Sequence, residues 1–226
     1  MKQTLARRVV AEVLGTSFLL AAVVGSGIMA ERLAGANAAL ALLANTVATG
    51  ATLLVLILTF GRVSGAHFNP IVSLSSLLAG ELNWKVFAFY GCAQIAGAIV
   101  GVMLANMMFS LPVVSFSHHA RGGVEQLLSE FVASFGLVMV IAGVAQRGWN
   151  VVALAVAAYI SAAYWFTPST SFANPAVTIA RSLSDTFTGI APSNVPGFVL
   201  AQILGAITAT VLCRWLFSGT ENTESN

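Results

Sequence analysis

Charged residues are scarce in this sequence: they make up 8% of its 226 residues, whereas a soluble domain carries about 25%. The net charge of +2 is small and its charges are scattered, which argues against a nucleic-acid partner. The 2 cysteines, Cys92 and Cys213, stand in apolar runs without metal-like spacing, so we interpret them as packing residues. No nucleophile–base pair, metal cluster or phosphate-binding loop is recognisable, so we expect no enzymatic activity, no cofactor and no metal site.

Apolar residues dominate instead, at 58% of the chain, and their runs reach about 20 residues, the length of a transmembrane helix. The first run resembles a signal peptide, because Lys2, Arg7 and Arg8 precede it. However, Glu12 interrupts its hydrophobic part, and the surroundings of Glu12 recur at Glu130, deep in the chain. We therefore predict an all-α membrane protein in which this run is a transmembrane helix.

Polar residues, Gly and Pro divide the apolar sequence into six long segments and two short ones. The short segments, about 70–79 and 175–184, would each span about 15 Å, half of a hydrocarbon core of about 30 Å. We predict that these two are re-entrant half-helices and that the six long segments are transmembrane helices. The transmembrane helices are expected at about 9–29, 38–60, 84–108, 125–146, 151–167 and 197–217.

Each half-helix is predicted to begin at an Asn-Pro pair, Asn69-Pro70 or Asn174-Pro175. Proline fits the first helical position, where no backbone N–H is needed, and asparagine fits the position before it. Two half-helices that meet head-on would bring both Asn amides to the middle of the membrane. Polar groups are tolerated there only inside protein or along a water-filled path.

Three landmarks recur in the same order in the two halves of the chain. They are a glutamate (Glu12 and Glu130), the Asn-Pro pair, and a glutamine in an Ala-Gln-Ile triplet (Gln94 and Gln202). Each half holds three predicted spans, an odd number, so the second half enters the membrane inverted relative to the first. Inverted repeats with broken helices are typical of channels and transporters.

We therefore predict a single transmembrane domain over residues 1–226, with inverted repeats at about 8–110 and 123–217 and a disordered tail at about 219–226. The distribution of Lys and Arg predicts that both termini lie in the cytoplasm. With that orientation, seven basic residues lie inside and three outside: Lys2, Arg7, Arg8, Arg62, Lys85, Arg147 and Arg214 against Arg32, Arg121 and Arg181.

The paired Asn-Pro motifs, Ser64-Gly65-Ala66-His67 before the first motif, and the Glu-led first and fourth helices resemble the aquaporin and aquaglyceroporin family. The resemblance covers about residues 8–217. It implies a homotetramer in the lipid bilayer, in which each protomer has its own passive pore for water or small uncharged solutes. In such a pore, Asn69 and Asn174 donate N–H groups to a passing oxygen, and the positive ends of the half-helices repel cations.

The family usually has Arg directly after its second Asn-Pro-Ala, at an outer constriction, and this sequence has Val177. Carrying over the other constriction positions by their spacing gives Thr49, Ala162 and Ser171. Such a ring is short, weakly polar and uncharged, and predicts a wide selectivity filter. Filters without Arg resemble a bacterial subgroup associated with arsenic resistance, which implies a cell (inner) membrane channel for arsenite or other metalloid acids, glycerol and similar polyols. Ile71 departs from the family's usual Ala in the first motif.

Several residues have two interpretations. Arg181, one turn beyond Val177, either returns a cation to the outer vestibule or snorkels at the end of the half-helix. Glu12 and Glu130 either buttress the re-entrant loops or relay protons, as in an ion-coupled secondary transporter. His67 either lines the pore or makes a structural hydrogen bond. The remaining alternative is a structural membrane protein with a closed pore.

Aromatic and histidine residues near the predicted outer surface complete the candidates. Tyr164 and Trp165 are expected to anchor a helix at the membrane interface. His118 and His119 lie in a predicted outer loop and are expected to be solvated, with a metal or pH response left open.

Overall fold

A computed structural model describes residues 3–217, and every regular element in that part of the chain is a helix. Within these residues, six helices are long and apolar enough to cross a membrane, which confirms the predicted number. The predicted tail at about 219–226 lies outside the described residues. The long helices are α1 (Leu5–Leu33), α2 (Ala38–Ser64), α4 (Trp84–Met108), α5 (Val124–Val144), α6 (Trp149–Phe166) and α8 (Val195–Leu216).

Two short helices, α3 (Pro70–Leu78) and α7 (Pro175–Arg181), follow the Asn-Pro pairs. With 9 and 7 residues, they are shorter than the segments predicted at 70–79 and 175–184. α7 ends at Arg181 because the next backbone N–H groups bond three residues back instead of four: that of Ser182 to the Ile179 carbonyl oxygen at 3.3 Å, and that of Leu183 to the Ala180 carbonyl oxygen at 3.0 Å. Single turns of 3-10 helix, η1 (Ala145–Arg147) and η2 (Pro192–Asn194), precede α6 and α8.

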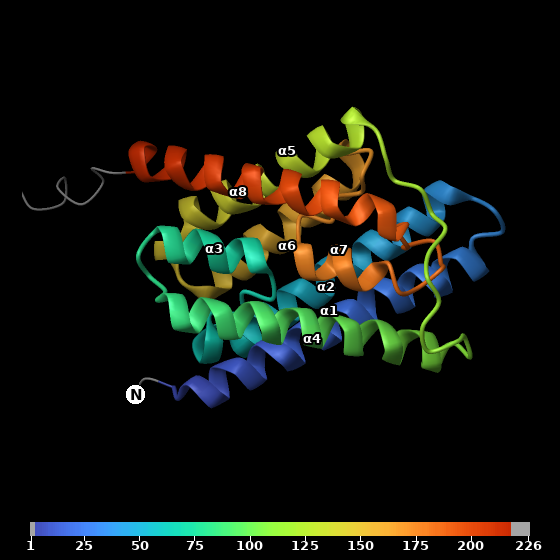
Figure 1. Cartoon of the computed structure of the whole chain (residues 1–226), viewed down its shortest axis with the longest axis horizontal. Coiled ribbons are helices and arrows are strands. Elements are labelled where there is room, and N and C mark those ends of the chain that lie inside the picture. The colour runs from blue at the N-terminus through green and yellow to red at the C-terminus, as the bar shows by residue number, and fades with distance from the viewer. Residues whose placement is uncertain (1–2, 218–226) are drawn as a thin grey trace, which may run out of the picture.

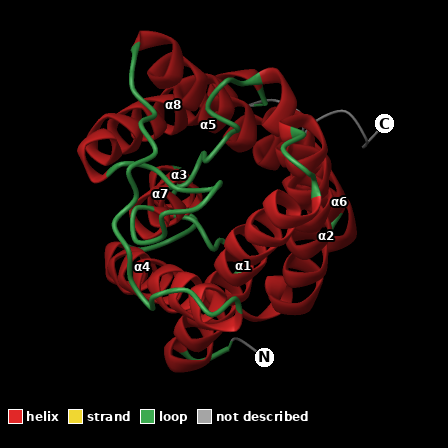
Figure 2. Ribbon diagram, turned by 90° about the vertical axis from the view of Figure 1, so that its right-hand side faces the viewer, coloured by secondary structure: helices red, strands yellow, loops and turns green. Residues whose placement is uncertain are grey.

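The two halves of the chain pack in the same way. α1 lies against α2 and α4, α5 lies against α6 and α8, and α2 meets α6 across the halves. The half-helices α3 and α7 lie between α4 and α8 (Figure 2). In the side view they lie in line, with their N-termini toward each other (Figure 1). The predicted all-α fold with two half-helices is therefore confirmed.

Each half contains a matching helix contact that requires glycine. A Cβ at Gly97 of α4 would lie 2.5 Å from the Val13 carbonyl oxygen of α1, and one at Gly205 of α8 would lie 2.4 Å from the Phe131 carbonyl oxygen of α5. Since both neighbours are backbone atoms, a larger residue would force the helices apart. Small residues allow this close approach inside membranes.

The candidate pore

The two Asn-Pro tips contact each other through their asparagine side chains. Asn69 Nδ2 donates to the Ala173 carbonyl oxygen at 2.7 Å, and Asn174 Nδ2 donates to the Phe68 carbonyl oxygen at 2.8 Å. Each Oδ1 also accepts from its own half-helix, from the Ile71 N–H at 3.1 Å in the case of Asn69. An amide has two N–H hydrogens, so each asparagine keeps one beyond the bond to the opposite loop.

The loops before both tips hold residues in the left-handed backbone region. Ala66 and Phe68 have φ of 48° and 50°, and the equivalent Ser171 and Ala173 have φ of 49° and 45°. Such conformations cost about 1–3 kcal/mol each for residues other than glycine and persist only when the surroundings hold them. The loops therefore need strong partners.

Glu12 of α1 supplies these partners to the first loop. Its Oε1 accepts from the Ser64 hydroxyl at 2.6 Å and from the His67 N–H at 3.0 Å. Its Oε2 accepts from the Phe68 N–H at 2.7 Å and from Gln94 Nε2 at 2.8 Å. The carboxylate is fully buried, and these four donors replace the water that it loses.

Glu130 of α5 does the same for the second loop. It accepts from the N–H groups of Phe172 and Ala173, each at 2.9 Å, and from Gln202 Nε2 at 2.6 Å. Gln202 also donates to Thr178 of α7 at 2.8 Å, so α8, α5 and the half-helix are tied together. Both glutamates and both glutamines found by internal repetition thus occupy matching positions.

A cavity of about 190 Å³ runs past the two tips. It contacts Glu81 and Trp149 near one end, Asn69 and Asn174 at the tips, and Val177 near the other end. Its wall is mostly apolar and takes one stripe from each neighbouring helix. The α6 stripe consists of Trp149, Val152, Val156, Ile160 and Tyr164.

The α6 stripe corrects one predicted filter residue. Ala162 is exposed on the outside of the helix and is absent from the cavity wall. Steps of three or four residues keep a helix face, and Ala162 is two residues from both Ile160 and Tyr164, on the opposite side. Tyr164, which we expected at the membrane interface, is buried and lines the cavity instead. Counting the helical period from Trp149, rather than back from Asn-Pro, would have found it.

The Val177 end of the cavity thus contains an aromatic side chain. Tyr164 donates its hydroxyl to Thr49 Oγ1 at 3.3 Å, which links α6 to α2 across the cavity wall. Ser171 and Val177 also line the cavity, as predicted from spacing. The side chains that form this end are therefore Thr49, Tyr164, Ser171 and Val177, without a guanidinium at position 177.

At the other end, His67 combines both of its expected roles. Its ring lines the cavity, and Nδ1 lies 3.0 Å from the Ser73 hydroxyl of α3. The ring also packs edge-on against Tyr90, with centroids 5.3 Å apart. These contacts fix the orientation of the imidazole beside the path.

Arg181 does not snorkel to the surface. Its side chain is 2% exposed and lines the cavity. Nε donates to the Thr188 carbonyl oxygen, and the guanidinium carbon lies 3.5 Å from the centroid of the Phe172 ring. Arg121 approaches the same ring at 5.1 Å, and burial lowers the pKa of its guanidinium. Two cationic groups therefore flank Phe172, a residue that the spacing argument had missed.

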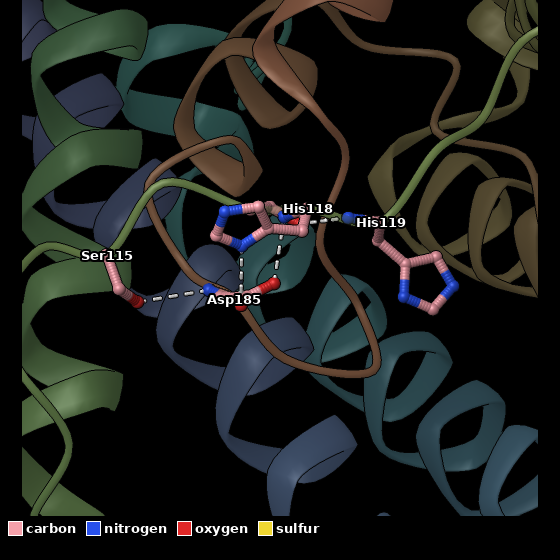
Figure 3. Close-up of polar contacts among 5 residues, drawn as sticks. Ser115, His118, His119 and Asp185 are labelled. Carbon is pink, nitrogen blue, oxygen red and sulfur yellow. Dashed lines mark hydrogen bonds and ion pairs between the residues drawn. The ribbon is translucent and has the colours of Figure 1, made fainter.

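The loops near the Val177 end of the cavity are joined by polar contacts (Figure 3). The Asp185 carboxylate accepts from the His118 backbone N–H at 2.9 Å and lies 3.0 Å from His118 Nδ1. The Asp185 backbone N–H donates to the Ser115 hydroxyl oxygen at 3.1 Å. The two hydrogen bonds from His118 lower the pKa of Asp185, and the bond from the backbone N–H has the larger effect. Burial and then Arg121 lower the pKa of His119. The His118 side chain is 88% exposed, as expected.

A helical membrane bundle in which two half-helices abut beside a lined cavity has the architecture of a membrane channel. The family profile described as major intrinsic protein matches residues 1–152 and 144–226, and the chain belongs to this family. This confirms the family proposed from the sequence. Members of this family are channels and not enzymes.

Individual relatives agree with this assignment. The chain is 56% identical over 212 residues to aquaglyceroporin AqpS of Rhizobium meliloti (strain 1021), covering 94% of this chain and 91% of that protein. It is 31% identical to aquaporin NIP1-3 of Oryza sativa subsp. japonica, covering 94% and 73% of the two chains. The crystal structure of the aquaglyceroporin from Plasmodium falciparum superposes with a TM-score of 0.73 at 20% identity, covering 94% and 95%, and supports the fold.

Proposed function

We propose that this chain is a passive aquaglyceroporin-type channel for small uncharged solutes, namely arsenite and other metalloid acids, glycerol and similar polyols, and water. The observation that carries the proposal is the cavity that passes the abutting tips of α3 and α7 and contacts both asparagines. Each protomer of a homotetramer would contain one such pore. Both termini would lie in the cytoplasm, with the chain in the cell (inner) membrane.

The midplane supports passage of oxygen-bearing solutes. Asn69 and Asn174 line the cavity, and each has one amide hydrogen beyond the bond to the opposite loop. The positive ends of α3 and α7 point at the same place, because their N-termini meet there. A solute hydroxyl can accept from these amides, whereas a cation meets two positive dipole ends.

The outer constriction supports a preference for compact neutral solutes with several hydroxyl groups. Val177 leaves the position beyond the second motif uncharged, and Thr49 and Ser171 are small. Tyr164 narrows this end relative to a ring with alanine. Arsenous acid and glycerol are uncharged at neutral pH and carry three hydroxyl groups each, which suits a weakly polar passage of this kind.

The hydrogen bonds of the two glutamates favour a channel over an ion-coupled transporter. Glu12 has four donors and Glu130 has three, all of them loop or helix groups rather than a chain of titratable residues. We infer that both carboxylates buttress the half-helices. A proton relay would need bonded groups that can take up the proton, whereas the groups that bond these carboxylates are backbone N–H groups, one hydroxyl and two side-chain amides.

Osmotic swelling of proteoliposomes tests the proposal. Vesicles that contain the purified protein are mixed with water, glycerol, urea or arsenous acid gradients, and permeabilities are measured by stopped-flow light scattering. We expect glycerol and arsenous acid to pass faster than through protein-free vesicles. A structural membrane protein with a closed pore predicts no increase for any solute.

A further inference from the structure

The position of Arg181 is unusual for a buried cation in a membrane protein. The side chain is 2% exposed, yet among residues 3–217 no carboxylate forms an ion pair with it. Its one hydrogen bond within this part of the chain joins Nε to the Thr188 carbonyl oxygen. The two terminal nitrogens have no such bond, and the side chain lines the cavity. Buried charges are ordinarily paired, so this group calls for an explanation.

Neighbouring charges do not neutralise Arg181. Glu130 is a carboxylate whose charge acts on it, but the Glu130 oxygens already accept from Phe172, Ala173 and Gln202. Arg121 adds a second positive charge on the same Phe172 ring. The local balance is therefore positive, and water or a solute in the cavity is the remaining partner for the free N–H groups.

Arg121 shows what a structural arginine looks like in this protein. Its guanidinium donates to three backbone carbonyl oxygens, those of Gly189 at 2.8 Å and of Ser169 and Phe187 at 3.3 Å each. It ties three outer loop segments together and leaves few N–H groups free. Arg181 has one such bond, so it anchors the loops less than Arg121 does. Its contact with the cavity accounts better for its position.

We propose that Arg181 is the charge-selective residue of the outer entrance, where its guanidinium excludes cations and donates hydrogen bonds to small hydroxylated or oxyacid solutes. This inference rests on the proposed channel function. Four residues along α7 separate the backbones of Arg181 and Val177 by about 6 Å. The guanidinium lies over the ring of Phe172, the residue that follows Ser171, so the charge reaches the cavity wall from one turn further along α7. A solute would exchange water for the N–H groups of the two terminal nitrogens there as it passes Tyr164 and Val177.

This placement separates two tasks that a filter arginine performs together. At position 177 a guanidinium would both narrow the constriction and carry the positive charge. Here Val177 leaves position 177 small and uncharged, which admits bulkier hydroxylated solutes, while Arg181 still repels cations from the cavity wall. Fixed positive charge near the path is one of the barriers by which channels of this kind exclude protons and cations.

The test compares Arg181→Gln with the wild-type protein in proteoliposomes. Three permeabilities are measured on each preparation: glycerol by swelling, methylammonium by isotope uptake, and protons by an entrapped pH dye. Removal of this positive charge from the cavity wall predicts methylammonium and proton leaks at least about tenfold higher, with glycerol permeability within about twofold of wild type. Arg181→Lys should restore the low leak, because it restores the charge.

Arg32→Gln is the matched control. Arg32 lies at the outer end of α1, is exposed, and donates to the Phe109 carbonyl oxygen at 3.0 Å, so its removal changes the outer charge without changing the cavity. Its cation leak should equal that of wild type. If Arg181→Gln does not fold, Arg181→Met replaces it, because its apolar stem keeps the contact with Phe172.

The possible outcomes are distinct. If wild type passes glycerol but the neutral variant at position 181 leaks no more cation than Arg32→Gln, the role of Arg181 is refuted and the channel function stands. If wild type passes no neutral solute at all, the proposed function itself fails. An equal leak in Arg181→Lys and Arg181→Gln would also refute the proposal, since it would show that charge is not the cause.

Discussion

Replacement of Glu130 by glutamine tests the buttress most sharply. The change keeps the size of the side chain but turns one acceptor oxygen into an NH2 donor. The carboxylate faces three donors, from Phe172, Ala173 and Gln202, at 2.6–2.9 Å. Gln202 can turn its amide to present oxygen, but a backbone N–H cannot turn. At least one loop N–H should therefore lose its acceptor.

The expected loss follows from these contacts. A hydrogen bond to a charged group contributes about 1.5–3 kcal/mol, and a buried donor left without a partner costs about 1–3 kcal/mol. The bond that is lost also helps to hold Ser171 and Ala173 in left-handed conformations. We expect the free energy of unfolding in detergent to fall by about 2–4 kcal/mol, and the glycerol permeability to fall with it as the second tip loosens.

The matched control is Glu125→Gln, on an exposed residue in the first turn of the same helix. It should change stability by less than about 0.5 kcal/mol. The reasoning is refuted if both variants are equally stable. Unchanged stability together with loss of proton-dependent flux would instead support the relay that we argue against.

Other perturbations have equally defined outcomes. Gly97→Ala should lower the free energy of unfolding by about 1–3 kcal/mol, because its Cβ meets backbone, whereas Gly91→Ala should not, because nothing lies within 4 Å of the Cβ. Tyr164→Ala should raise the permeability of polyols larger than glycerol, relative to that of glycerol, in swelling assays. If this permeability ratio equals that of the wild-type protein, Tyr164 does not form part of the constriction. Val177→Arg should lower glycerol and arsenous acid permeability more than that of water. The pKa of Asp185 is lowered in the folded state, so its bonds to His118 should be present above the ordinary carboxyl pKa of 3.8 and lost as the pH falls below it. Hydrogen-exchange protection of this loop, after correction for the intrinsic pH dependence of amide exchange, should therefore fall below that pH, and Asp185→Asn should remove this fall in protection.

Features that depend on neighbouring residues, or that recur in both halves of the chain, could be predicted from the sequence. Helix lengths follow from apolar runs, and the Asn-Pro pairs begin α3 and α7 as capping rules require. Glu12 and Glu130 could be paired with their loops because the two halves repeat. Each of these features depends on a few neighbouring residues or on internal similarity.

The outer end of the cavity could not be predicted in the same way. Its residues come from α2, α6, α7 and the loops, so their spacing in sequence depends on loop length. Counting back from Val177 across such a loop placed Ala162 where the helix face presents Tyr164. Arg181 and Phe172 meet through a ring contact that no sequence period signals.

The most direct test of the central claim is glycerol flux through the protein after proton and sodium gradients have been collapsed with ionophores. A continuous passive path beside the abutting tips predicts that swelling proceeds at an unchanged rate and depends on the glycerol gradient alone. Swelling that stops when the ion gradients are removed, or that never exceeds the rate of protein-free vesicles, would contradict the account.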